Sequence, residues 1–383
     1  MNQHIFLCDA ERAAALGDEL RAAGVSGEMS SGADGAALFV EATAIALNSD
    51  SDPEMLAPAL AFARQSLPNA ELFADASVNH IVRCASQAVI EACDDAGDWA
   101  LHILRAEDAD APGPNRARLL RSEIEAQLKK RRRRLLRSLA PDDAPVDVSS
   151  APTTLVQLYL ESRERTWLSI VRPGAQASSD AFWRRCLSPW PGGLWQATEN
   201  REPPSRAYRK LAEALEQFPW IGGGIGDVDS AGEGPPGSRG AALAIQAGDR
   251  VVDLGASPGG WSWVALQRGA RVLAVDRSPL RADLMQHAKL DFVQGDAFQY
   301  RPESPVDWLI CDVIAFPDRI LELLRDWVAM KRCRNFCVTV KFRGAGDYGV
   351  LVELKNMLNK HARDFALRRL SENKNEVTAF GCL

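Results

Sequence analysis

One stretch constrains the fold of this chain more than any other, Val251-Val-Asp-Leu-Gly-Ala-Ser-Pro-Gly-Gly-Trp-Ser262. Its apolar start predicts a buried strand at 250–254, which runs through a Gly-rich loop at 255–260 into a helix that begins near Trp261. A strand, a tight loop and a helix N-terminus in this order present backbone N–H groups and the positive end of a helix dipole to a ligand. The sequence therefore predicts an α/β fold with a ligand at the carboxyl ends of its strands.

The acid at the end of this first strand indicates a cationic ligand. The loop lacks the Gly-x-Gly-x-x-Gly spacing of a dinucleotide site, which argues against a dehydrogenase. A buried carboxylate would repel a phosphate but attract the ammonium and sulfonium of S-adenosylmethionine (SAM). Two later apolar segments also end in acids, at positions suited to a ribose diol and an adenine amino group. We expect cofactor contacts from Asp253, Gly255, Ser257, Pro258, Gly259, Gly260, Trp261, Asp276, Asp296 and Asp312.

The segment 253–262 resembles motif I of the FtsJ/RrmJ-type ribose 2′-O-methyltransferases. Within that family it is most similar to the RlmM-like enzymes, which modify a cytidine of 23S ribosomal RNA. The family's signature is a Lys-Asp-Lys-Glu tetrad, and this chain has a matching context for each member. The contexts are Ser205-Arg-Ala-Tyr-Arg-Lys210-Leu, Trp308-Leu-Ile-Cys-Asp312, Phe336-Cys-Val-Thr-Val-Lys341 and Asn375-Glu376-Val-Thr-Ala-Phe380. The resemblance implies SAM as cofactor and Lys210, Asp312, Lys341 and Glu376 as catalytic residues.

The reaction explains why these residue types are needed. A ribose 2′-hydroxyl is a poor nucleophile near neutral pH, so its proton must leave as the methyl group arrives. A lysine can accept that proton only if its pKa is lowered by burial or by a neighbouring cation. We hypothesise that Lys341 is the general base and that Lys210 is the cation that lowers its pKa. Asp312 would orient Lys341, and Glu376 would position Lys210 or the ribose.

Length and composition indicate an ordinary protein of more than one domain. A chain of 383 residues with 46% hydrophobic and 25% charged residues suggests about two or three domains. No run approaches the ~20 apolar residues that span a bilayer, and the N-terminus lacks the pattern of a signal peptide. We therefore expect a cytoplasmic protein without a membrane partner. The eight cysteines have no Cys-x-x-Cys spacing and the five histidines are dispersed, so we expect reduced thiols and no metal site.

Four regions follow along the chain. Residues 1–75 interleave strands at 4–8, 36–41 and 70–75 with helices at 11–23 and 53–65, which looks like a ferredoxin-like domain. In 76–172 the order is a helix at 78–96, a strand at 99–104, a helix at 116–137 and two strands at 154–160 and 166–171. This order resembles a THUMP domain, an RNA-capturing module that RlmM-like enzymes carry. Residues 173–200, rich in Pro, Gly, Ser and Trp, predict a linker in which Trp190 and Trp195 pack against a domain.

Residues 201–383 alternate strands and helices, which predicts a doubly wound, Rossmann-like methyltransferase sheet. A closing hairpin at 365–380 would supply the reversed strand that methyltransferases of this class carry. The helices are expected near 261–268, 279–288, 317–330 and 347–362. The strands are expected at 250–254, 271–276, 291–294, 307–312 and 335–341. A Gly/Pro-rich segment at 222–240 is longer than the family needs, which leaves open how Lys210 is held.

The net charge of −6 argues against a generic nucleic-acid binder, but one segment is strongly basic. Six consecutive cations repel one another, and phosphate is a natural partner for them, although such a run can also be a solvated helix face. We expect RNA contacts from Lys129, Lys130, Arg131, Arg132, Arg133 and Arg134.

The proposed partner is 23S rRNA, as naked or early precursor RNA, because the target nucleotide must be splayed out to reach the pocket. Two alternatives stay open. The first is the same chemistry on another RNA such as tRNA. The second is a SAM-binding ribosome-assembly factor without activity, against which an intact tetrad argues.

Overall fold

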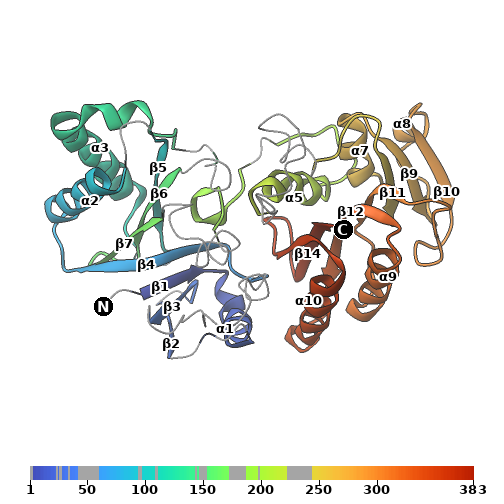
Figure 1. Ribbon diagram of the computed structural model, residues 1–383, viewed down its shortest axis with the longest axis horizontal. Helices are drawn as coiled ribbons and strands as arrows, with labels where there is room; N and C mark the ends of the chain where they lie inside the picture. Colours follow the sequence, from blue (N-terminus) through green and yellow to red (C-terminus); the bar gives the residue numbers. More distant parts are fainter. Residues whose placement is uncertain are drawn as a thin grey trace, which may run out of the picture. The chain divides into compact units, whose positions relative to one another are not determined.

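The computed structural model describes residues 3–22, 25, 28–32, 35–41, 60–93, 97–107, 111–142, 145, 153–171, 187–196, 199–221 and 244–383. The chain divides into two compact units, Met1–Gln196 and Ala197–Leu383. We refer to them as the N-terminal and C-terminal units (Figure 1). The second unit coincides closely with the methyltransferase region expected from the sequence at 201–383.

The N-terminal unit contains one seven-stranded sheet in the order β2-β3-β1-β4-β7-β6-β5. Neighbouring strands are antiparallel except for the parallel pair β5–β6. The first half of β4 pairs with β1 and its second half with β7, so one strand joins the two expected N-terminal regions. The strands are β1 (Gln3–Leu7), β2 (Met29–Ser31), β3 (Ala37–Glu41), β4 (Gln65–Ala74), β5 (Trp99–Arg105), β6 (Thr154–Leu160) and β7 (Arg165–Val171).

The expected boundary after residue 75 therefore lies within a single sheet, and one apolar cluster contains residues from both sides of it, such as Ile5 and Trp167. The ferredoxin-like and THUMP-like assignments remain predictions. Strand β2 was not anticipated, because its sequence Met-Ser-Ser lacks apolar alternation.

A helix was expected at 53–65, and the structure describes only residues 60–65 of it. For these residues the prediction is wrong, because 60–64 are not helical and β4 begins at Gln65. The backbone N–H groups of Ala61 and Phe62 donate to the buried carboxylate of Glu19, at 3.0 and 3.1 Å. The N–H of Arg64 donates to the carbonyl of Leu7. These distant partners take the donors that a helix would need. The rest of that expected helix lies outside the described residues.

Helices α2 (Val78–Ala92) and α3 (Pro114–Arg131) pack together beside strands β5 to β7 (Figure 1). Ser77 caps α2 by accepting a hydrogen bond from the N–H of His80. Leu120, Ile124 and Leu128 recur every four residues on α3 and form its buried stripe. A shorter helix, α1 (Ala13–Ala22), buries Leu16 and Leu20 in the same way.

The expected single helix at 116–137 breaks at Arg132 and continues as a 3₁₀ helix at Arg133–Arg137. Arg132 has φ/ψ angles of −154° and 64°, which are not helical. Its guanidinium donates to the carbonyls of Ile90 and Cys93, at 2.6 and 3.2 Å, at the C-terminal end of α2. The last carbonyls of a helix are unpaired and carry the negative end of the dipole, so a cation is favoured there.

The described part of the expected linker, 187–196, packs onto the N-terminal unit. The amide of Gln65 donates to the carbonyl of Ser188 at 3.1 Å and accepts from its N–H at 2.9 Å. Trp190 and Trp195 are buried, as expected from the sequence. Residues 172–186 lie outside the described residues.

The C-terminal unit contains a second seven-stranded sheet, in the order β10-β9-β8-β11-β12-β14-β13. Strands β8 to β12 run parallel, and β14 is antiparallel to both β12 and β13. This is the doubly wound sheet with one reversed strand that the sequence predicts. The strands are β8 (Arg250–Leu254), β9 (Arg271–Asp276), β10 (Leu290–Gln294), β11 (Val306–Cys311), β12 (Cys333–Lys341), β13 (Asp364–Arg368) and β14 (Glu376–Cys382).

Helices cover both faces of this sheet (Figure 1). On one side α5 (Tyr208–Ile221) packs on α7 (Gly260–Gln267), and on the other α9 (Pro317–Ala329) packs on α10 (Val350–His361). Helix α8 (Ala282–Met285) is shorter than expected, because the chain turns at His287, whose Nδ1 accepts from the N–H of Lys289. Among the described residues, no helix is both long and apolar enough to cross a membrane.

Candidate active site

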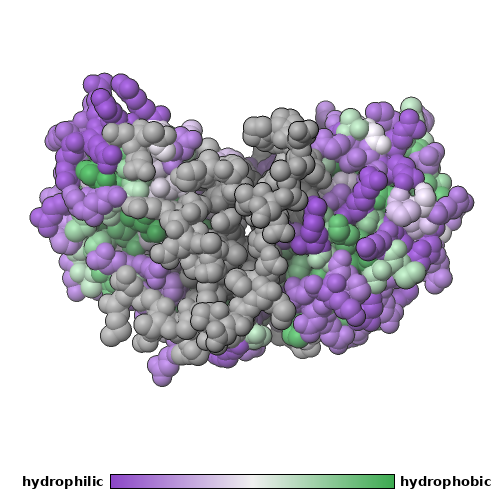
Figure 2. All heavy atoms as spheres, in the orientation of Figure 1, coloured by the Kyte–Doolittle hydropathy of each residue, from purple (hydrophilic) through white to green (hydrophobic). Residues whose placement is uncertain are grey.

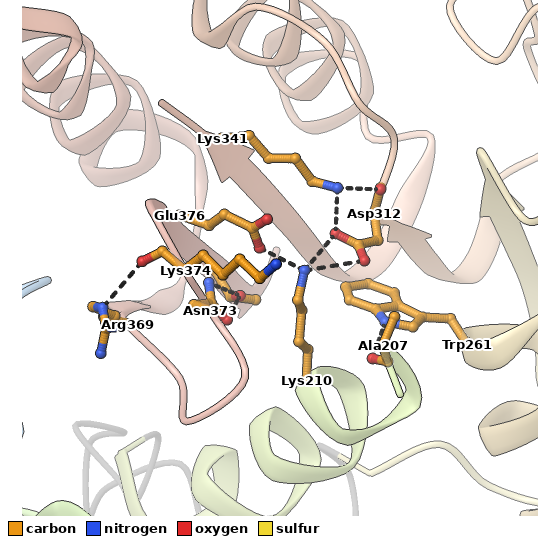
Figure 3. A network of polar contacts seen from close by, with 10 residues as sticks. Ala207, Lys210, Trp261, Asp312, Lys341, Arg369, Asn373, Lys374 and Glu376 are labelled. Carbon is orange, nitrogen blue, oxygen red and sulfur yellow. Dashed lines mark hydrogen bonds and ion pairs between the residues drawn. The ribbon is translucent and has the colours of Figure 1, made fainter. Parts of the chain in front are cut away.

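Three of the four predicted catalytic residues are brought together by strand register. Lys341, the last residue of β12, lies directly opposite Glu376, the first residue of the antiparallel β14. Asp312 immediately follows β11, the parallel neighbour of β12. All three lie at one edge of the sheet, where Lys341 contacts Asp312 directly and Glu376 joins them through Lys210 (Figure 3).

The fourth residue, Lys210, comes from α5 and is held by contacts to the motif I region. The indole N–H of Trp261 donates to the carbonyl of Ala207 at 2.8 Å. Gly260 leaves room for the same segment, since a Cβ there would lie 2.5 Å from Ser205 Oγ. The start of α5 is thereby fixed against α7. Residues 222–243 lie outside the described residues, so the effect of that long loop stays untested.

The four side chains form one polar cluster (Figure 3). The ammonium of Lys210 donates to both oxygens of Asp312, at 3.1 and 3.2 Å, and to Glu376 Oε2 at 2.5 Å. The ammonium of Lys341 donates to the backbone carbonyl of Asp312 at 2.8 Å and lies 3.1 Å from its Oδ1. Both lysine nitrogens therefore contact the same carboxylate oxygen. The predicted convergence of the two lysines is present in the free chain.

The cluster balances two cations with two carboxylates in a poorly solvated place. The side chains are only 8 to 18% exposed. Buried charges are tolerated when they are paired and hydrogen-bonded, and losing one partner leaves the other charge uncompensated. Asp312 contacts both lysines, whereas the sequence predicted that it orients Lys341. Glu376 contacts Lys210, which is one of its two predicted roles.

Glu213 was missed by sequence reasoning, although it lies three residues after Lys210 on α5. It is 1% exposed, and its carboxylate accepts from the N–H of Ser371 at 2.8 Å and from the amide of Gln217 at 3.0 Å. Ser371 belongs to the turn between β13 and β14, so Glu213 ties the helix of Lys210 to the hairpin of Glu376. Burial raises the pKa of Glu213 to about 7, against the opposing effect of the Ser371 hydrogen bond. A glutamate on the inward face of an amphipathic helix is the signal that could have found it.

The loop between β8 and α7 has the form that the sequence predicts. Gly255 and Gly259 have φ angles of 75° and 110°, which favour glycine. A Cβ on Gly255 would lie 2.7 Å from that of Val313, so the loop also packs closely against the residue after Asp312. The Ser257–Pro258 peptide bond is cis. No side chain caps the N-terminus of α7, where first-turn N–H groups lack intrahelical acceptors.

Asp253 lies beneath this loop and does not face the solvent. Its side chain is 1% exposed and accepts a hydrogen bond of 2.6 Å from Ser262 Oγ. Burial raises the pKa of Asp253 to about 7, and the charges of Asp312 and Asp276 add to this rise while Ser262 opposes it. The predicted contact of Asp253 with the cofactor stays a prediction. Its hydrogen-bond partner Ser262 was not singled out from the sequence.

The other two strand-end acids hold backbone. Asp276 accepts from the N–H groups of Ser257 and Ser278, at 3.0 and 2.8 Å. Asp296 accepts from the N–H of Phe298 at 2.9 Å and pairs with Arg277 at 2.8 Å. The Phe298 N–H and Arg277 lower the pKa of Asp296. A carboxylate has about four acceptor positions, so each acid can still accept from ligand hydroxyl or amino groups.

The donor set fits SAM, although the individual contacts remain predictions. Four groups lie at one sheet edge. They are Asp253, whose ionised form a cation would favour, the N-terminus of α7, which has no side-chain cap, and Asp276 and Asp296, which have spare acceptor positions. Two side chains are already engaged: Trp261 binds Ala207, and Ser257 Oγ donates to the carbonyl of Pro279. Among the described residues, no group of three or more His, Cys, Asp or Glu side chains could hold a metal ion.

Fold and site together are those expected of a methyltransferase domain. Residues 203–377 match the FtsJ-like methyltransferase family, a span that contains all four members of the cluster. Over these residues the C-terminal unit is similar to this family.

The similar proteins include several with one name, ribosomal RNA large subunit methyltransferase M. The protein of that name from Thauera aminoaromatica is 32% identical over 241 residues, which cover 61% of this chain and 57% of the relative. The one from Azoarcus sp. (strain BH72) is 33% identical over 201 residues, 51% of this chain and 50% of the relative. The matches span little more than half the length of these relatives.

Proposed function

We propose that this chain transfers a methyl group from SAM to the 2′-hydroxyl of a ribose, and that the ribose belongs to a cytidine in 23S rRNA. The observation that carries the proposal is the contact of Lys210 and Lys341 with one carboxylate oxygen of Asp312. A protein that only binds the cofactor has no need of two such lysines. The names of the similar proteins support ribosomal RNA as substrate.

SAM would supply an electrophilic methyl group on a sulfonium. In the proposed step the ribose oxygen forms a bond to that methyl, the carbon–sulfur bond breaks, and Lys341 accepts the hydroxyl proton. Asp312 holds Lys341 through its carbonyl and its Oδ1, which fixes the direction of the lysine's nitrogen. Lys210, fixed by Asp312 and Glu376, places a second positive charge beside the proposed base. In-line methyl transfer depends strongly on such positioning.

We propose that the N-terminal unit, with its ferredoxin-like and THUMP-like parts, binds the RNA. Hydrophilic side chains gather over α3 in Figure 2. Lys129, Lys130, Arg133 and Arg134 are exposed, and no ion pair is recorded for them within the described part of the chain. Arg131 is also exposed but donates to Gln87 at 2.5 Å. Arg132 differs from the rest because its guanidinium is occupied by α2. A substrate of naked or early precursor rRNA would place the protein in the cytoplasm.

The proposal is tested by mapping where the methyl group goes. The protein is incubated with labelled SAM and total RNA from cells that lack it, and the label is then located. Label on the ribose of one 23S rRNA cytidine is the expected result. Label on a base, or on tRNA alone, would overturn the ribosomal assignment. Bound cofactor without any label would favour the assembly-factor alternative.

A further inference from the structure

Two large apolar side chains are exposed directly beside the polar cluster. Ile314 and Phe316, two and four residues after Asp312, are 87% and 54% exposed. Exposed apolar area of this kind costs free energy in water unless something covers it. The backbone that carries Phe316 is nonetheless rigid, because its carbonyl accepts from the N–H groups of Arg319 and Ile320 at the start of α9. The ring is thus presented on a fixed support and remains 54% exposed.

A cation from the loop after Lys341 lies over this ring. The guanidinium of Arg343 is 4.8 Å from the ring centroid of Phe316. The carboxylate of Asp347 accepts a hydrogen bond from the backbone N–H of Arg343 at 2.8 Å and lies 3.5 Å from its guanidinium. Phe342 lies between Lys341 and Arg343 in the sequence and forms two hydrogen bonds with Asn375, the residue before Glu376. Its N–H donates to the carbonyl of Asn375, and its carbonyl accepts from the side-chain amide of Asn375. The loops of Asp312, Lys341 and Glu376 therefore meet around one ring–guanidinium pair.

We propose that Phe316, Arg343 and Ile314 form a stacking platform for a nucleobase of the RNA strand that presents the reactive ribose. This inference rests on the proposed function. An unpaired base needs an apolar or aromatic surface for its face and tolerates a guanidinium beside it, which is how single-stranded RNA is commonly held. Arg343 keeps N–H groups for a phosphate, since its side chain is 72% exposed. A ribose whose 2′-hydroxyl reaches Lys341 brings its own base and the next phosphates to the residues that follow Lys341 and Asp312.

Stacking requires an aromatic ring rather than this particular residue, so a matched pair of variants tests the platform. Phe316→Ala removes the ring, and Phe316→Tyr keeps it. Met330→Ala is the control, because Met330 is 63% exposed at the opposite end of α9. In vitro transcribed 23S rRNA and labelled SAM give KM and kcat, calorimetry gives SAM affinity, and filter binding gives RNA affinity. Thermal unfolding verifies that each variant folds.

Phe316→Ala is expected to raise KM for RNA by roughly 5- to 100-fold, which corresponds to one stacked base. SAM affinity should not change, and Phe316→Tyr and Met330→Ala should behave like the wild type. The platform is overturned if Phe316→Ala leaves KM and RNA binding unchanged, if Phe316→Tyr fails equally, or if SAM affinity falls in parallel. A wild-type protein that methylates no RNA overturns the proposed function instead. In that case, equal RNA binding by the wild type and Phe316→Ala would also overturn the platform.

Discussion

Two groups of cations in this chain are held in opposite ways. Lys210 and Lys341 are buried in the C-terminal unit, and each contacts a carboxylate within 3.1 Å. The basic residues at 129–134 follow one another on the surface of the N-terminal unit. Within the described part of the chain, Arg131 donates to Gln87 and Arg132 donates to the end of α2. The first group is brought together by elements far apart in the sequence, whereas the second is one continuous segment that spans the end of α3 and the 3₁₀ helix after it.

The difference indicates two kinds of function. A buried, paired cation has one geometry, so a single substitution should abolish what it does. Exposed cations act through summed potential, so each should contribute modestly and in a salt-dependent way. Variants of the two groups should therefore differ in both the size and the kind of their effect.

The largest effect is expected for Lys341→Ala. Without the proposed base, kcat should fall by roughly 10²- to 10⁴-fold, while SAM affinity is retained because the loop at 255–260 is untouched. Methyl transfer to RNA and calorimetric SAM binding measure the two quantities. Lys289→Ala is the matched control, an exposed lysine of the same unit that contacts the carbonyl of Gly269. Activity retained in Lys341→Ala would remove the base from the proposed mechanism.

Glu376→Gln should have the next largest effect. The change keeps the size of the side chain but removes one of the two charges that hold Lys210, so we expect kcat to fall and stability to drop by about 1–3 kcal/mol. Glu372→Gln, on the same hairpin, removes ion pairs with Arg206 and Arg209 and should cost about 0–1 kcal/mol. Kinetics and thermal unfolding compare the two variants. Equal losses would mean that Glu376 acts only as a structural ion pair.

The basic segment should respond differently. Replacing both Lys129 and Lys130 with Ala should weaken RNA binding and lower the slope of log affinity against log salt by about 1–2, because two phosphate contacts are lost. Arg132→Ala should instead lower the unfolding temperature, since the carbonyls of Ile90 and Cys93 lose their donor, and leave the salt slope nearly unchanged. RNA binding at several salt concentrations decides this. A salt slope that changes equally in both variants would mean that Arg132 also contacts RNA.

The same contrast explains what could be predicted from the sequence. Strand ends follow from apolar runs closed by an acid or a lysine, so the placement of Asp312, Lys341 and Glu376 at one sheet edge follows from sheet order alone. The break at Arg132 could not be predicted, because its cause is a contact with α2 some forty residues away. Residues 60–64 were misjudged for the same reason, since Glu19 and Leu7 take their backbone donors. The burial of Asp253 and the link through Glu213 also depend on tertiary packing.

The smallest expected effect concerns Asp253, which resembles the first group in burial but forms no ion pair among the described residues. Because its pKa is raised to about 7, the carboxyl is largely neutral in the free protein below that pH. Cationic SAM favours the ionised form of the carboxyl, so the affinity of the protein for SAM should rise as the pH increases through about 7, by roughly 3- to 10-fold.

Protein stability should change in the opposite direction. The contribution of this group is present below its ordinary pKa of 3.8 and is lost as the pH rises through about 7. In Asp253→Asn both trends should flatten, whereas Asp291→Asn, on the exposed face of β10, should keep them. Calorimetric SAM titrations at several pH values measure the first trend and thermal unfolding the second. An affinity that stays constant with pH in the wild type would mean that the charge of Asp253 does not reach the cofactor.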